Sequence, residues 1–235
     1  MTGTRVRGAI FDMDGTLYEL PGRKLRLTLA MPGDIGMLKH IGKARRALRD
    51  KEFGDRERLR GALWDELGRR TGVGPARAKS WYHDRFMTKF VDLLRRKARV
   101  RPGMVELLDK LKERGTRLAV LSDFGGVSER LEALRIPRQL FDDVVGAEDF
   151  GVLKPSPVPF VALAEKWGLV PTSLVVVGDR WDLDGASAEA AGMQFLGVVE
   201  RGLFGPGERT EVFRDWSYVR EQLDLRTRDE ANDEN

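Results

Sequence analysis

Two aspartates stand two positions apart near the start of the chain, directly after an apolar segment. Residues 9–11 are apolar and lead into Asp12 and Asp14, and Gly15 and Thr16 follow at once. Alternate residues of a strand share one face, so both carboxylates can point into one site. A divalent cation of the Mg2+ type would relieve their mutual repulsion, because hard cations take oxygen ligands. In a lone pair of this kind the acids would more simply cap the next turn, so partners elsewhere in the chain are needed.

Polar residues also follow two later apolar segments. Residues 118–121 lead to Ser122, and residues 174–177 lead through a glycine to Asp179. Adjacent parallel strands bring their carboxyl ends to one edge of a sheet, where open α/β folds bind ligands. Further charged residues that could reach this edge are Lys154, Asp182 and Asp184.

This combination of carboxylates, a hydroxyl and an amine is suited to phosphoryl chemistry. A metal ion and a lysine can neutralise phosphoryl oxygens, a hydroxyl can donate to them, and a carboxylate can attack phosphorus. In isolation, Ser122 would be interpreted as a helix cap and Lys154 as a solvated surface residue. The two gain meaning only beside Asp12, Asp14 and Asp179.

The segment from residue 101 onward alternates between helix and strand patterns. Strands are predicted near 118–121, 144–147, 174–177 and 195–199, and helices near 104–114, 127–134, 158–167 and 186–191. Such alternation predicts an α/β fold with a doubly wound parallel sheet. A final helix is predicted over residues 212–223.

Residues 18–100 differ from the rest of the chain in charge and in pattern. They hold 22 lysines and arginines against 10 acids, whereas the remainder holds 19 against 27. Apolar residues recur at helical spacing from about residue 32 to residue 98. We therefore predict an α/β core (1–17 and 100–225), an inserted all-helical cap (18–99) and a frayed tail (226–235).

At this point the sequence resembles the haloacid dehalogenase-like (HAD) superfamily of phosphohydrolases. Four family motifs occur in order, as residues 12–17, Ser122, Lys154 with its following proline, and Asp179 with Asp184. The resemblance covers roughly residues 5–17 and 100–200, and the inserted helices match the family's cap domain in position. It implies a Rossmann-like core, a Mg2+ cofactor and hydrolysis of a phosphomonoester.

The resemblance also implies a role for each matching residue. Asp12 would be the nucleophile that forms an aspartyl-phosphate, and Asp14 would be the acid and base. Ser122, Lys154 and Thr16 would contact the phosphoryl group or shape the loop around it. Tyr18 and Asp123 depart from the family pattern and could tune substrate choice. The implied metal site consists of Asp12, Asp14 through its backbone carbonyl, Asp179 and Asp184, with Asp182 as an alternative to Asp184.

The composition limits other classes of site and location. The 235 residues include no cysteine and two histidines, which excludes disulfides, thiolate metal sites and a histidine-rich metal centre. There is no apolar run of about 18 residues, and the first residues lack the features of a signal peptide. We therefore expect a cytoplasmic protein without a membrane partner.

The basic cap leaves more than one interpretation open. Its charge could steer anionic substrates into a cleft, but the arginines of segments 45–49 and 56–60 are more simply explained as solvated helix faces. Trp81, Phe86 and Phe90 stand at helical spacing and are interpreted as cap core. The oligomeric state and the identity of the substrate are not indicated by any motif.

The leading hypothesis is a Mg2+-dependent phosphatase acting on a small phosphorylated metabolite. A phosphomutase would use the same residues and remains an alternative. A dehalogenase is disfavoured, because Asp14 supplies acid–base chemistry that halide displacement does not need. An alternative of another class is a protein that binds nucleic acid or another polyanion through the basic cap, although no nucleic-acid module is recognisable.

Overall fold

The core of the protein is a six-stranded parallel sheet. The computed structural model describes residues 5–199 and 213–228. The strand order is β5-β4-β1-β6-β7-β8, and every neighbouring pair is parallel. The strands are β1 Gly8–Phe11, β4 Arg117–Ser122, β5 Asp143–Gly146, β6 Leu174–Gly178, β7 Gln194–Val198 and β8 Phe213–Arg214. The predicted α/β sheet is thus confirmed, and β8 is an addition that the sequence pattern did not indicate.

Helices cover both faces of this sheet. Ile10 of β1 packs with α8 Val158–Trp167 and α9 Ala186–Ala190 on one face. Phe11, the next residue, packs on the opposite face with helices α6 Met104–Glu113, α7 Val127–Ala133 and α10 Trp216–Arg226. This alternation follows from the two-residue period of a strand. All four residues of β1 are buried because it lies near the middle of a sheet covered on both sides.

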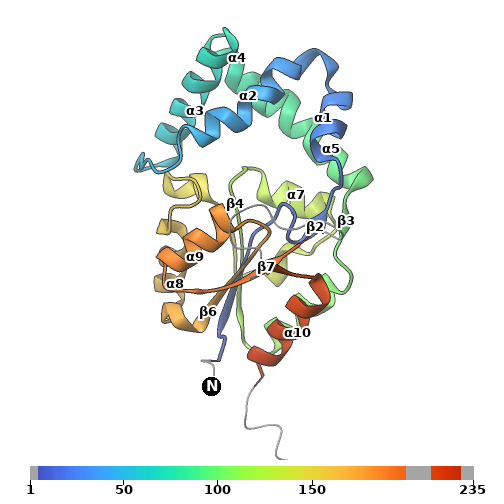
Figure 1. Ribbon diagram of the computed structural model, residues 1–235, viewed down its shortest axis with the longest axis vertical. Helices are drawn as coiled ribbons and strands as arrows, with labels where there is room; N and C mark the ends of the chain where they lie inside the picture. Colours follow the sequence, from blue (N-terminus) through green and yellow to red (C-terminus); the bar gives the residue numbers. More distant parts are fainter. Residues whose placement is uncertain (1–4, 200–212, 229–235) are drawn as a thin grey trace, which may run out of the picture.

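The inserted segment forms a separate layer of helices. Figure 1 shows α1–α5 lying across the end of the core sheet to which β1 and β6 lead. The cap helices are α1 Arg23–Ala30, α2 Ile35–Arg46, α3 Arg56–Thr71, α4 Pro75–Ser80, the π-helix Trp81–Met87 and α5 Thr88–Lys97.

Two features of the insertion went beyond the sequence prediction. Helix α1 lies before residue 32, where the sequence predicted the helical pattern to start. The sequence did not predict this helix, because Leu27 is its single buried residue and one residue gives almost no periodic signal. The two chain crossings between cap and core form a short antiparallel pair, β2 Tyr18–Glu19 with β3 Arg99–Val100. Two-residue strands are too short to show alternation. Within the described parts of the chain, no helix is both long and apolar enough to span a membrane.

The end of the chain departs from the predicted frayed tail. Helix α10 starts at Trp216, with the Asp215 carboxylate accepting from the Tyr218 N–H, rather than at residue 212. The Arg226 carbonyl accepts a 2.9 Å hydrogen bond from the Val6 N–H, and Thr227 is fully buried. Residues 226 and 227 are therefore attached to the core, and the rest of the predicted tail, 229–235, lies outside the described residues, as do residues 200–212.

A buried ion-pair cluster joins the cap to the core. Arg45 of α2 donates a 2.8 Å hydrogen bond to Glu148, which lies in the 3-10 turn Ala147–Phe150, and Arg60 of α3 donates at 2.9 Å to the other carboxylate oxygen. Arg45 is 4% exposed and also donates to the Asp123 carbonyl. The prediction that the arginines of segment 45–49 form a solvated face is therefore wrong for Arg45.

We expect the substitution Glu148→Ala to lower the free energy of unfolding by about 3–5 kcal/mol, because it leaves a buried guanidinium without its counter-charge. The double variant Arg45→Met/Glu148→Leu should be closer to wild type, since both charges are removed together. Urea denaturation measures both effects. Glu66→Ala, which breaks the pairs of Glu66 with Arg69 and Arg70 on α3, is the surface control and should cost less than about 1 kcal/mol. Equal costs for Glu148→Ala and Glu66→Ala would contradict the prediction.

Candidate active site

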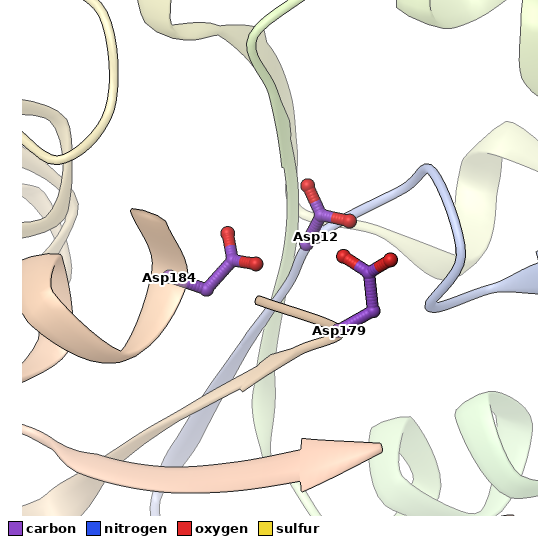
Figure 2. A group of neighbouring side chains, drawn as sticks. All are labelled: Asp12, Asp179 and Asp184. Carbon is purple, nitrogen blue, oxygen red and sulfur yellow. The ribbon is translucent and has the colours of Figure 1, made fainter. Parts of the chain in front are cut away.

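Three carboxylates converge at the carboxyl ends of β1 and β6. Asp12 follows β1, Asp179 follows β6, and Asp184 lies in the π-helical turn Trp181–Gly185 that precedes α9. One oxygen of each lies within 4.8 Å of the others. Figure 2 shows the three side chains gathered around a common space. The tertiary structure thus brings Asp12 together with two acids that lie more than 160 residues later in the chain, as the motif order implied.

The electrostatics of these acids fit a cation. Burial raises the pKa of Asp179 well above its ordinary value, and the charges of Asp12 and Asp184 raise it further. Burial likewise raises the pKa of Asp184 to about 7, although Lys154 opposes the shift. Asp12 and Asp184 are buried and Asp179 is half-buried, and one lysine cannot balance the charge of all three carboxylates when they are ionised. Such a set of oxygen ligands suits a hard divalent cation like Mg2+.

Lys154 occupies the position between two of the acids. Its Nζ lies 2.8 Å from Asp12 Oδ1 and 2.7 Å from Asp184 Oδ1, and it donates a 3.0 Å hydrogen bond to the Leu121 carbonyl. The side chain is 2% exposed, and the carboxylates raise its pKa against the effect of burial. A lysine this deeply buried is stable only beside its counter-charges, so the interpretation as a surface residue is excluded.

Asp14 occupies a different environment from Asp12. Its carboxylate accepts from Arg130 and from the Tyr18 hydroxyl, and the Arg23 guanidinium lies 3.4 Å away. Burial alone would raise the pKa of Asp14, but Arg130 and Arg23 overcome this effect and lower it to about 2. Two carboxylates only two residues apart therefore have opposite electrostatic surroundings. The Asp14 side chain lies outside the three-carboxylate cluster, so a metal contact would fall to its backbone carbonyl.

Arg130 and Tyr18 are functional-site residues whose roles the sequence analysis missed. Arg130 is fully buried and also donates a 2.9 Å hydrogen bond to Ser122 Oγ. A signal for it existed, because Arg130 shares an apolar helix face with Val127 and Leu134, where an arginine needs a buried partner. Tyr18 is likewise buried and holds Asp14, so its hydroxyl supports the acid.

The remaining predicted residues, Thr16 and Ser122, contact the acids from buried positions. Thr16 Oγ1 donates a 3.1 Å hydrogen bond to Asp12 Oδ2, and Ser122 Oγ lies 3.5 Å from Asp14 Oδ2. Both side chains are fully buried. Asp123 holds the loop by accepting from the Lys154 N–H. In this arrangement Thr16 is bonded to the nucleophile candidate, which leaves its hydroxyl hydrogen committed to Asp12.

Asp182 and Asp184 are separated by their surroundings. Asp184 belongs to the buried cluster, whereas the Asp182 side chain is 43% exposed and pairs with Arg180 and, at 3.8 Å, with Arg49. The turn that carries both acids presents only Asp184 to the site. This placement agrees with the assignment of Asp184, and not of Asp182, to the metal site.

A cavity of about 540 Å3 opens above these acids, between the core and the cap. Its described lining includes Asp12, Asp14, Lys154 and the two other acids of the cluster, but neither Ser122 nor Thr16. Its opposite wall is helix α2 and the loop that follows. That wall is rich in cations, contributed by Lys39, Lys43, Arg45, Arg46 and Arg49. One side of the cavity therefore carries carboxylates, and the opposite side carries positive charges.

Two glycines allow the chain to approach the acids closely. Gly15 has a φ of 93°, and a Cβ there would lie 2.7 Å from Asp179 Cγ. At Gly178 a Cβ would lie 2.5 Å from Asp184 Cγ. Neither acid could keep its position next to a larger residue.

We expect Gly178→Ala to destabilise the protein by about 1–3 kcal/mol and to displace Asp184, because the added methyl group overlaps that side chain. Urea denaturation measures the cost, and a crystal structure shows the displacement. Gly61→Ala is the matched control: it lies in α3, a Cβ there meets nothing within 4 Å, and alanine favours the helix. An unchanged Asp184 position in Gly178→Ala would count against this explanation of the glycine.

Comparisons with known proteins agree with this geometry. The model of the haloacid dehalogenase-like hydrolases matches residues 6–192. A glyceraldehyde 3-phosphate phosphatase of Methanopyrus kandleri is 31% identical over 203 residues, 80% of this chain and 82% of the relative. A phosphoglycolate phosphatase of Rhodospirillum rubrum is 32% identical over 80% of this chain and 77% of its own length.

Solved structures show the same fold. The 2-haloacid dehalogenase of Pseudomonas syringae superposes with a TM-score of 0.62 over 94% of this chain and 99% of its own, at 21% identity. At that identity the likeness concerns the fold alone. Together with the matched family model, these findings show that the chain belongs to the haloacid dehalogenase-like hydrolase family and is an enzyme of that family.

Proposed function

We propose that the protein is a Mg2+-dependent phosphatase that hydrolyses a small phosphomonoester through an aspartyl-phosphate on Asp12. One observation carries the proposal: Asp12 lines a cavity whose opposite wall carries cations, and it lies beside Lys154 and two further acids. The relatives named as phosphatases of phosphoglycolate and glyceraldehyde 3-phosphate support the same reaction class.

Asp12 is held in an orientation suited to attack. Lys154 binds one carboxylate oxygen, Thr16 binds the other, and the Asp12 N–H donates to the Val177 carbonyl at 2.8 Å. In the proposed first step an Asp12 oxygen bonds to phosphorus as the bond to the leaving alcohol breaks. Water then attacks the phosphorus, which releases inorganic phosphate and restores the carboxylate. Lys154 offsets the negative charge that accumulates on the phosphoryl oxygens.

Asp14 is the proposed acid and base, and its surroundings favour the ionised form, which is the form that can accept a proton. With a pKa of about 2, it is a carboxylate in the observed arrangement and can accept a proton from the attacking water. Donation to the leaving alcohol requires that Asp14 first bind a proton, which Arg130 and Arg23 oppose. The negative charge of a bound phosphoryl group would raise the pKa of Asp14, and Arg23, which lines the cavity, could bind that group in place of Asp14. Substrate binding thereby favours the protonated form when an acid is needed.

A divalent cation would be held by the Asp12 and Asp179 carboxylates and the Asp14 backbone carbonyl, with Asp184 acting nearby. When bound, Mg2+ would polarise a phosphoryl oxygen and offset the repulsion between the substrate and Asp12. The fit rests on the carboxylates of Asp12, Asp179 and Asp184, because Lys154 balances only part of their combined negative charge.

We expect Asp12→Asn to lower phosphate release by at least about 1,000-fold, because an amide cannot replace the carboxylate nucleophile. The assay measures inorganic phosphate from phosphoglycolate and glyceraldehyde 3-phosphate with Mg2+ present. Asp182→Asn, which changes the exposed neighbouring acid, is the control and should keep most of the activity. Retention of wild-type activity in Asp12→Asn would refute the mechanism. Transfer of phosphate within the substrate without its release would indicate a phosphomutase.

Mg2+ should raise the thermal unfolding temperature, because an ion that binds only the folded state stabilises it. We expect this shift to be lost in Asp179→Asn, whose amide removes one anionic ligand from the cluster. It should persist in Asp182→Asn, whose side chain lies outside the cluster. Differential scanning calorimetry with and without Mg2+ measures the shift. An equal shift in both variants would place the metal elsewhere.

A further inference from the structure

A second cavity lies beside the catalytic one and has an apolar lining. This apolar chamber is an open groove with a volume of about 400 Å3, and its apolar wall includes Leu27, Leu38, Ile41, Phe86, Phe90 and Phe124. Its size falls in the range of small-molecule sites in proteins, roughly 300–1,000 Å3. Five of these six residues come from the cap, and Phe124 comes from the loop after β4.

The apolar chamber adjoins the catalytic groups directly. Arg23 and Phe124 line both cavities. Arg23 lies 3.4 Å from Asp14 Oδ1, and the Phe124 N–H donates a 3.2 Å hydrogen bond to Ser122 Oγ. The Arg130 guanidinium, which binds Asp14, lies 5.2 Å from the centre of the Phe90 ring. A molecule bound at Asp12 therefore has an apolar compartment within reach.

Helix α2 forms the shared wall and changes character along its length. Ile41 lines only the apolar chamber, Lys43 and Arg46 line only the catalytic cavity, and Leu38 and Lys39 line both. Gly42 lies between Ile41 and Lys43 and lines both cavities. A Cβ at Gly42 would meet nothing within 4 Å, so the helix leaves open space where the two cavities meet.

Packing of the cap core explains only part of this arrangement. Phe86 and Phe90 stack at 5.9 Å between ring centres and are at most 4% exposed, as expected for core residues. Phe124 belongs to the catalytic domain, is only partly buried, and has the Arg45 guanidinium 4.6 Å from its ring centre. The exposed residues Lys24, Ile35 and Lys39 also line the chamber, so it is an open groove and not a void inside a packed core.

We propose that the substrate's leaving group carries an apolar ring that occupies the apolar chamber while its phosphoryl group lies at Asp12. The inference rests on the proposed phosphatase function and narrows its substrate class. Phe86, Phe90 and Phe124 offer ring faces and edges to such a group. Phosphoglycolate and glyceraldehyde 3-phosphate have no apolar part that could fill this compartment, so this chain would differ from the relatives named for them.

A matched pair of alkyl phosphates tests the proposal. n-Propyl phosphate and 3-phenylpropyl phosphate release alcohols of similar acidity, because the ring is three carbons from the oxygen. We expect kcat/KM to be at least about tenfold higher for the phenyl compound, since burial of an aromatic ring is favourable by more than the 1.4 kcal/mol that corresponds to a factor of ten. A ratio of one or less, with propyl phosphate hydrolysed, would overturn the inference and leave the phosphatase function standing.

A variant at the junction locates the effect. Gly42→Leu places a side chain in the open space between the cavities and should reduce the phenyl-to-propyl ratio of kcat/KM by at least about fivefold. Gly36→Leu, on the exposed side of the same helix, gains the same side chain in open space and should keep the wild-type ratio. An unchanged ratio in Gly42→Leu, with the fold verified by circular dichroism, would overturn the inference.

The proposed function and the inference fail in different ways. If wild type with Mg2+ releases no phosphate from the two alkyl esters, phosphoglycolate or glyceraldehyde 3-phosphate, both are overturned. If phosphoglycolate is hydrolysed with a kcat/KM more than tenfold above that of 3-phenylpropyl phosphate, only the inference is overturned.

Discussion

The site depends on how the charges of three neighbouring carboxylates, two buried and one half-buried, are balanced. Asp12, Asp179 and Asp184 lie within 4.8 Å of one another at the carboxyl edge of the sheet, where burial disfavours their ionised forms. Lys154 supplies one positive charge between Asp12 and Asp184. The negative charge that it leaves unbalanced is what makes the cluster a suitable site for a divalent cation. The glycines at 15 and 178 allow this crowding, because a side chain at either position would overlap an acid.

At the same edge of the sheet, the two aspartates Asp12 and Asp14 have different surroundings. Asp12 is surrounded by acids and one lysine, whereas Asp14 is held by Arg130, Arg23 and Tyr18. Two aspartates only two positions apart, directly after β1, therefore have opposite electrostatic environments. The proposed nucleophile and the proposed acid and base need different properties, and the charged residues around each carboxylate differ accordingly. Arg130 is central to this division, because it binds Asp14 and Ser122 at once.

The cap completes the site in two ways. Arg45 and Arg60 bind the core through Glu148, which fixes helices α2 and α3 relative to the sheet. The α2 face held in this way presents cations to the catalytic cavity and apolar residues to the chamber beside it. The candidate catalytic residues thus lie in the core, and the residues that line both cavities opposite them come mainly from the cap.

The sequence by itself determined the parallel α/β core, the helical insertion and the positions of Asp12, Asp179 and Lys154. These follow from local apolar runs and from polar residues placed where strands end, both of which are properties of neighbouring residues. Only the tertiary structure decided that Arg130 and Tyr18 hold Asp14, that Arg45 is buried, and that Asp184 enters the cluster. Each of these depends on contacts between residues far apart in the chain or on the orientation of one turn, and a periodic pattern carries no information about either.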